Sequence, residues 1–240
     1  MRRFFAQNIN ASGDKAVLTC DEARHIKNVL RMKPGDEVLL IDGSGAEFRS
    51  VISSVTGDSV ELDIIEKGAC EADPNVLVTL FQCLPKQGKM EVIIQKCVEL
   101  GVYAVVPTVS DRCVVKLDGK DSKLQRWNKV SVEAAKQCGR ANVPEVKAPA
   151  KLSSLDPSEF DIVLFAYENE GDRTLKQALK AAGDLRSAAV VIGPEGGFTP
   201  SEAEELIEKG AVSVSLGKRI LRTETAGMAA LAQIMYELEQ

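Results

Sequence analysis

The fold of this chain is decided by the stretch Ala188-Ala189-Val190-Val191-Ile192-Gly193-Pro194-Glu195-Gly196-Gly197-Phe198-Thr199-Pro200-Ser201-Glu202. Its apolar first part, residues 188–192, predicts a buried strand, and the glycines that follow predict a tight turn. Thr199 can cap a helix, Pro200 suits the first helical position, and Glu202 can close a capping box. The stretch therefore predicts a strand, a glycine-rich turn and a helix in immediate succession.

A second unit of the same kind follows. Val212, Val214 and Leu216 alternate as a short strand, and the next turn reads Gly217-Lys218-Arg219-Ile220-Leu221-Arg222. Apolar residues then recur at helical spacing, so a helix is expected from about Thr223. Both turns leave the carboxyl ends of strands and open helices. We therefore expect them to lie side by side above an α/β sheet, where ligands usually bind.

The rest of the chain divides into two parts. Residues 1–70 predict a small β-barrel with one early helix at 21–30, and glycine turns join its short strands, which are expected at 37–41, 47–55 and 60–65. A polar stretch with glycine and proline marks the boundary, so the second domain is expected at 74–240.

The second domain alternates between strands and helices. Strands are expected at 76–83, 103–109 and 161–167, and helices at 88–100, 120–138 and 174–182. This alternation predicts a largely parallel, buried sheet.

The composition excludes several classes of protein. A 240-residue chain that is 45% hydrophobic can form a proper core, and its net charge of −5 argues against indiscriminate binding of polyanions. The six cysteines are scattered and do not cluster with the single histidine, His25. We therefore expect a cytosolic protein with reduced thiols, no metal site, no signal peptide and no membrane span.

A local basic face could still dock RNA selectively on an acidic protein. Basic residues are concentrated near the N-terminus, and others follow predicted strands of the second domain; solvated surface side chains are the alternative interpretation. The candidate RNA-binding residues are Arg2, Arg3, Arg24, Lys27, Arg31, Lys86, Lys89 and Arg112.

The first turn lacks the Lys-Ser/Thr of a phosphate-binding loop and does not follow the GxGxxG pattern, so binding of phosphates is disfavoured. Gly196 and Gly197 would let backbone amides approach a flat or bulky ligand; a strained connection without a ligand is the alternative. Glu195 could interact with a cationic group or be solvated. Arg222 beside Glu224 could hold a positive charge at the pocket mouth or form a surface ion pair.

The two turns together closely resemble the motifs of the ribosomal RNA small subunit methyltransferase E family. The resemblance continues in Arg3-Phe4-Phe5, in Lys33-Pro34-Gly35-Asp36 and in Glu133-Ala134-Ala135-Lys136-Gln137-Cys138-Gly139-Arg140, and it spans nearly the whole chain. The usual family sequences carry Ser where this chain has Cys138, a nearly isosteric change.

The resemblance implies an α/β SPOUT methyltransferase fold with a C-terminal trefoil knot, preceded by a small PUA-like β-barrel that docks RNA. It implies a homodimer that uses S-adenosyl-L-methionine without a metal. The implied reaction is methylation of N3 of one uridine in 16S ribosomal RNA on the assembled small subunit. A SPOUT methyltransferase for another RNA such as tRNA, or a non-catalytic RNA-binding assembly factor, is the alternative.

The resemblance also assigns site residues. For catalysis the hypothesis is that Arg222 stabilises charge on the target base, with Glu195 and Glu224 orienting groups around it, while the residue that takes the proton stays open. The implied cofactor-binding residues are Ala166, Glu168, Gly193, Pro194, Glu195, Gly196, Gly197, Leu216, Gly217, Ile220, Leu221, Arg222, Thr225 and Ala226.

Overall fold

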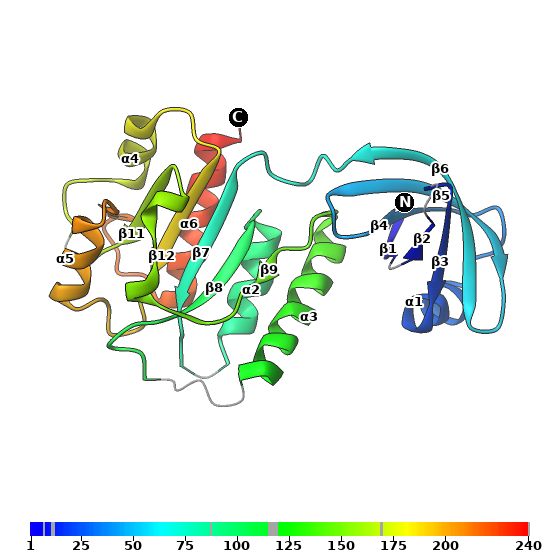
Figure 1. Cartoon of the computed structure of the whole chain (residues 1–240), viewed down its shortest axis with the longest axis horizontal. Helices are drawn as coiled ribbons and strands as arrows, with labels where there is room; N and C mark the ends of the chain where they lie inside the picture. The colour runs from blue at the N-terminus through cyan, green and yellow to red at the C-terminus, as the bar shows by residue number, and fades with distance from the viewer. Residues whose placement is uncertain (7, 11–12, 87, 115–119, 169, 240) are drawn as a thin grey trace. The chain divides into compact units, whose positions relative to one another are not determined.

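The computed structural model describes all residues except 7, 11–12, 87, 115–119, 169 and 240. The chain forms two compact units: Met1–Asp73 with Ala135–Val143, and Pro74–Ala134 with Pro144–Gln240 (Figure 1). The sequence-based division into 1–70 and 74–240 leaves residues 135–143 in the second domain.

Contacts with residues far away in the sequence hold residues 135–143 in the first unit. Arg140 Nε lies 3.0 Å from Asp73 Oδ1, and the backbone N–H of Asn142 donates to Asp73 Oδ2 at 2.7 Å. Ala141 is buried in a small cluster with Ile41 and Cys70. Local periodicity carries no information about such contacts, which explains why the sequence did not place this segment.

The first unit contains a six-stranded sheet in the order β1-β4-β5-β6-β3-β2. Its strands are β1 Arg2–Phe5, β2 Asn8–Ile9, β3 Lys15–Thr19, β4 Glu37–Ile41, β5 Ala46–Val55 and β6 Ser59–Ala69. The strands expected at 37–41, 47–55 and 60–65 are confirmed as β4 to β6. Their alternating side chains bury one core, which includes Leu40 and Leu62.

The early helix of the first unit differs from its prediction. The segment expected at 21–30 is α1, Cys20–Arg24, followed by a π-helical turn, η1, His25–Leu30. Arg31 ends it in the left-handed region with φ 53°. Apolar spacing predicts a helical segment but not its hydrogen-bond pattern, so the π turn could not be foreseen.

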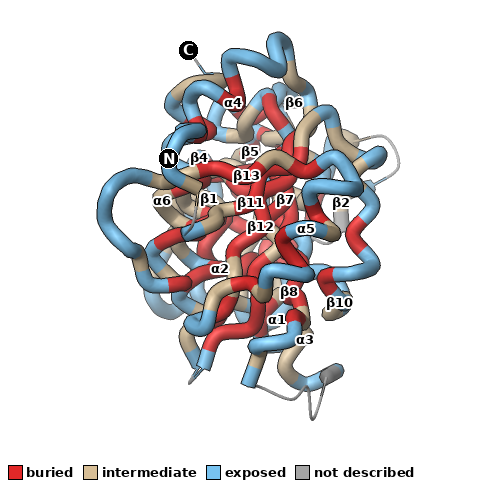
Figure 2. Tube along the Cα trace, turned by 90° about the vertical axis from the view of Figure 1, so that its left-hand side faces the viewer, coloured by how far each residue is buried: buried red, intermediate tan, exposed pale blue. Residues whose placement is uncertain are grey.

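The second unit contains a seven-stranded sheet in the order β10-β8-β7-β12-β11-β13, with β9 paired to β8. Its strands are β7 Leu77–Cys83, β8 Ala104–Val109, β9 Glu145–Val146, β10 Ala150–Lys151, β11 Ile162–Ala166, β12 Ser187–Ile192 and β13 Val212–Val214. Every one of these pairings is parallel, which confirms the predicted sheet type. The central strands are buried along most of their length (Figure 2).

Helices cover this sheet. They are α2 Met90–Glu99, α3 Lys120–Cys138, α4 Leu175–Ala182, α5 Pro200–Glu208 and α6 Thr223–Leu238, with short 3₁₀ turns η2 Leu152–Ser154 and η3 Pro157–Glu159. α6 contacts α2, α4, β7 and β12. α5 buries Ala203 and Leu206 against Phe165 and Val191. The helices expected at 88–100, 120–138 and 174–182 are confirmed within two residues at each end.

The described part of the chain offers no helix that combines the length and the apolar character needed to cross a bilayer. It also holds no group of three or more His, Cys, Asp or Glu side chains arranged to bind a metal ion.

The predicted capping box of α5 generates a stability test. Thr199 Oγ1 accepts the backbone N–H of Glu202 at 3.2 Å, and Glu202 Oε2 accepts the backbone N–H of Thr199 at 2.8 Å. We expect Thr199→Ala to lower the free energy of unfolding by about 1 kcal/mol, measured by urea denaturation. Thr199→Ser keeps the acceptor and should lose much less. Equal losses in both variants would contradict a stabilising cap.

Candidate functional site

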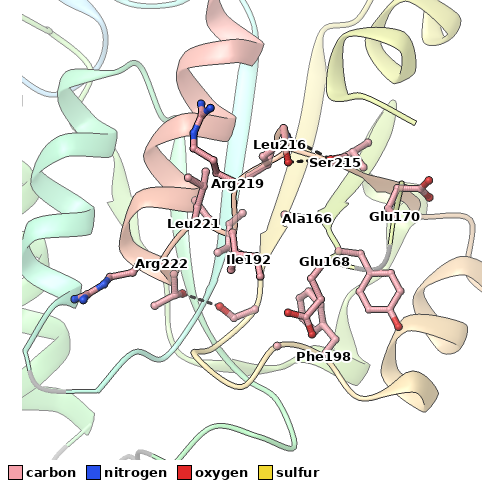
Figure 3. A pocket seen from close by; sticks show the side chains of 18 of the residues that line it. Ala166, Glu168, Glu170, Ile192, Phe198, Ser215, Leu216, Arg219, Leu221 and Arg222 are labelled. Atoms are coloured by element: carbon pink, nitrogen blue, oxygen red, sulfur yellow. Dashed lines mark hydrogen bonds between the residues drawn. The ribbon is translucent and has the colours of Figure 1, made fainter. Parts of the chain in front are cut away.

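A cavity of about 820 Å³ opens at the carboxyl ends of three adjacent strands, β12, β11 and β13 (Figure 3). Three loops supply most of its walls, one after each strand. The lining residues are Lys89, 166–168, 170–171, 174, 192–195, 197–198, 214–224 and 226. The two turns singled out in the sequence therefore do face one cavity, and the loop after β11 completes it.

Most of the expected cofactor-binding residues line this cavity. The exceptions are Gly196 and Thr225. Sequence reasoning missed several lining residues, among them Glu170, Gly171 and Thr174. The Glu170 carboxylate accepts a hydrogen bond from the hydroxyl of Ser213. This bond, and a second one from the backbone N–H of Arg173, lower the pKa of the Glu170 carboxyl.

The first turn needs glycine for conformational and steric reasons. The backbone N–H of Gly197 donates to Pro194 O at 2.9 Å. Gly197 has φ 67°, a backbone angle that residues with a side chain rarely adopt. A Cβ at Gly197 would lie 3.2 Å from Glu168 Oε1. A side chain there would push into the cavity wall, so glycine keeps the backbone accessible from the cavity.

Arg112 supports the first turn although it does not line the cavity. Its Nη1 donates to Gly196 O at 2.7 Å and to Phe198 O at 3.2 Å. The neighbouring backbone N–H of Asp111 donates to Glu202 Oε1 at 2.8 Å. Arg112 was expected to bind RNA, because the sequence shows its charge but not its partners. In the structure its guanidinium also fixes two carbonyls of the turn.

A buried hydroxyl connects the first turn with α6 and β7. Thr223 Oγ1 donates to Gly193 O at 2.6 Å and accepts from Gln82 Nε2 at 2.9 Å. The same Nε2 donates to Cys83 O at 3.1 Å. Sequence reasoning missed Gln82; the available signal was one amide inside an apolar strand.

Gln82 also has a buried oxygen, Oε1, without a hydrogen-bond partner among the described residues. A Cβ at Gly227 would lie 3.0 Å from it, so α6 approaches β7 closely at this glycine.

An ammonium group lies between the two carboxylates predicted to be catalytic. Lys89 Nζ is 3.1 Å from Glu224 Oε1 and 3.9 Å from Glu195 Oε1. Glu195 Oε1 also accepts the backbone N–H of Lys86 at 3.0 Å. The pKa of the Glu224 carboxyl is lowered by its own backbone N–H, and Lys89 and Arg222 act in the same direction. One basic and two acidic side chains therefore meet at this point of the cavity.

The cation between the carboxylates differs from the one expected. Sequence reasoning placed Arg222 there and assigned Lys89 to RNA binding. Arg222 is exposed at the start of α6, and its side chain extends away from the other labelled residues in Figure 3. The role of Arg222 stays a prediction, but Lys89 occupies the position at the two carboxylates.

The basic residues of the first unit have different environments. Arg2, Arg24, Lys27 and Arg31 are exposed. Arg3 instead donates from Nε and Nη2 to Glu47 Oε1 at 3.1 and 3.0 Å. The guanidinium of Arg3 is therefore already part of the unit's own structure.

Comparisons with known proteins agree with this architecture. A family described as RNA methyltransferase domain matches residues 72–235, and one described as RNA methyltransferase PUA domain matches residues 18–65. The ribosomal RNA small subunit methyltransferase E of Bacillus subtilis is 37% identical over 100% of this chain and 98% of its own length. The enzyme of the same name from Mycobacterium tuberculosis is 32% identical, over 96% and 90% of the two chains.

A solved structure extends the similarity to three dimensions. The ribosomal RNA small subunit methyltransferase E of Neisseria gonorrhoeae, bound to S-adenosyl methionine, has a TM-score of 0.85 and 32% identity, with 99% of this chain and 98% of that chain covered. The second unit thus has a methyltransferase fold, preceded by a PUA-like unit. With relatives above 30% identity over nearly its full length, this chain belongs to the ribosomal RNA small subunit methyltransferase E family.

Proposed function

We propose that this chain methylates N3 of one uridine in 16S ribosomal RNA, on the assembled small ribosomal subunit. RNA methylation with S-adenosylmethionine is the activity of its family. The observation that carries the proposal for this chain is the cavity of about 820 Å³ at the carboxyl ends of three parallel strands. Its size and its mixture of apolar walls, glycine turns and carboxylates suit a nucleoside that bears a charged chain.

The residues present fit S-adenosylmethionine. Ile192, Phe198, Val214 and Leu221 supply apolar walls for a flat adenine, and the glycine turns bring backbone N–H and C=O groups close enough to recognise its edge. The bound cofactor supplies an activated methyl group on a positively charged sulfur. The carboxylates on the cavity wall favour that positive charge. We assign cofactor binding to the residues implied by the family motifs.

Uracil N3 places specific demands on the protein. It lies on the Watson–Crick edge, so the base must be unpaired and turned into the cavity. N3 carries a proton, and its loss develops negative charge on the uracil oxygens. A fixed cation would stabilise that charge, as an oxyanion hole does. Glu195, Glu224 and Arg222 are the proposed catalytic residues.

We also propose that the second unit is knotted and that the chain works as a homodimer, as its family motifs imply. β13 is at one edge of the sheet, yet α6, which follows it, packs against β7 and β12 and is bonded through Thr223 to Gly193. Such a return of the chain across the sheet supports a knotted path.

The central test uses labelled S-adenosylmethionine. Small subunits, or naked 16S RNA, from cells that lack the modification are incubated with the protein, and the digested nucleosides are identified. We expect labelled 3-methyluridine from the assembled subunits. Absence of label there, with cofactor binding intact, would contradict the proposal. It would favour another RNA substrate such as tRNA first and a non-catalytic assembly factor second.

The support that Arg112 gives to the first turn predicts a role in cofactor affinity. Arg112→Ala removes two hydrogen bonds to carbonyls of the turn, and we expect about a tenfold weaker Kd for S-adenosylhomocysteine by calorimetry. Arg186→Ala is the matched control, because Arg186 precedes the other end of β12.

The same Arg112 variant separates cofactor support from RNA docking. If Arg112 acts only on RNA, Arg112→Ala will leave the Kd for S-adenosylhomocysteine unchanged. It will then reduce the salt dependence of RNA binding by about one phosphate contact.

RNA docking by the first unit predicts a salt effect. Arg24, Lys27 and Arg31 are exposed on α1, η1 and the residue after them. Replacing all three with Ala should lower the slope of log affinity for small subunits against log salt, by about 0.7–0.9 per lost phosphate contact. The affinity for S-adenosylhomocysteine should not change. An unchanged salt slope would place RNA docking elsewhere.

A further inference from the structure

Lys89 has the position of a catalytic cation in the cavity. It precedes α2, so its backbone is fixed by the start of a helix whose Met90, Ile93 and Ile94 are buried. Its side chain is 31% exposed, and its ammonium group contacts two carboxylates. The other basic residues that line the cavity, Lys218, Arg219 and Arg222, are exposed on the second turn.

The charges of this cluster select the kind of group that can bind there. The ammonium of Lys89 offers a donor, and the carboxylates of Glu195 and Glu224 beside it offer acceptors. A neutral group with a donor next to an acceptor fits, because its donor can meet a carboxylate and its acceptor the ammonium. The N3–H of uracil, flanked by O4 and O2, has this arrangement.

We propose that Lys89 is a catalytic residue, whose ammonium donates to a uracil carbonyl oxygen while the Glu195 carboxylate accepts the N3 proton. The proposal rests on the proposed function, and it assigns to Lys89 the charge stabilisation expected of Arg222. Glu224 holds Lys89 in place through the shorter ion pair of 3.1 Å. Glu195, at 3.9 Å from the ammonium, is less tightly attached and is assigned as the acceptor.

The step is balanced within these groups. The N3–H bond breaks, its electron pair stays on the uracil, and the proton passes to Glu195 and then to water. The pair on N3 forms the new bond to the methyl carbon as the bond between that carbon and sulfur breaks. The sulfur keeps its electron pair, and S-adenosylhomocysteine leaves. Lys89 remains protonated throughout and stabilises the charge on the uracil oxygen.

Lys89→Met tests the assignment. We expect the single-turnover rate of 3-methyluridine formation to fall about 100-fold at saturating cofactor, as when an oxyanion-hole donor is removed. The Kd for S-adenosylhomocysteine should change less than about threefold. Lys96→Met is the matched control, because Lys96 lies on the same helix, pairs with Glu99 and does not line the cavity. It should retain the wild-type rate.

A modified substrate separates catalysis from structural support. Small subunits with 5-fluorouridine at the target have a more acidic N3, so they need less stabilisation of negative charge. On this substrate we expect the ratio of the wild-type rate to the Lys89→Met rate to be at least about tenfold smaller than on uridine, because the missing cation matters less when the base ionises readily.

Four results would overturn the proposal. The first is an unchanged rate in Lys89→Met, and the second is a cofactor affinity reduced as much as the rate. The third is a rate of Lys89→Met that falls by the same factor on the uridine and the 5-fluorouridine substrates. The fourth is an Arg222→Met variant whose rate falls on uridine and recovers on 5-fluorouridine, while the rate of Lys89→Met does not recover. The wild-type protein reports separately on the proposed function, because its failure to form 3-methyluridine would overturn that function and the assignment of Lys89 together.

Discussion

The hydroxyl group of Thr223 makes the contact on which the cavity depends. Its bonds to Gly193 O and Gln82 Nε2 connect the first turn, the end of β7 and the start of α6. β12 and β13 are separated in the sheet by β11, so strand pairing alone does not join the two turns that face the cavity. Since Thr223 is buried, removing its oxygen would leave buried partners unsatisfied, at a cost of about 1–3 kcal/mol.

Several charged side chains around the cavity form hydrogen bonds with the backbone of its loops. Arg112 binds two carbonyls of the first turn, Glu202 accepts two backbone N–H groups, and Glu195 accepts that of Lys86. These bonds hold the first turn, with its two adjacent glycines, and the segments next to it. A site ordered before binding loses less conformational entropy when the ligand arrives, so the loops can be glycine-rich and still present a defined surface.

Local features of both units could be predicted from the sequence, and long-range ones could not. The strand, turn and capped helix at residues 187–208 follow from apolar runs and capping residues, which act over a few positions. β1 pairs with β4, and Arg140 binds Asp73, across long separations that leave no periodic signal. The expectation that the two turns share a cavity is confirmed, and it followed from their position after parallel strands. The hydrogen bonds through Thr223 and Gln82 that connect the two turns became visible only in the structure.

The basic residue that pairs with Glu224 also could not be predicted from local sequence. Arg222 is close to Glu224 in the sequence, so local reasoning favours it as the partner of that carboxylate. The structure instead brings Lys89 from the start of α2, and Lys89 Nζ lies 3.1 Å from Glu224 Oε1. Stabilising a developing charge requires a donor whose position is fixed before the reaction. Both Lys89 and Arg222 stand at the start of a packed helix, but only Lys89 lies between two carboxylates, whereas the side chain of Arg222 is exposed, so Lys89 meets that requirement better.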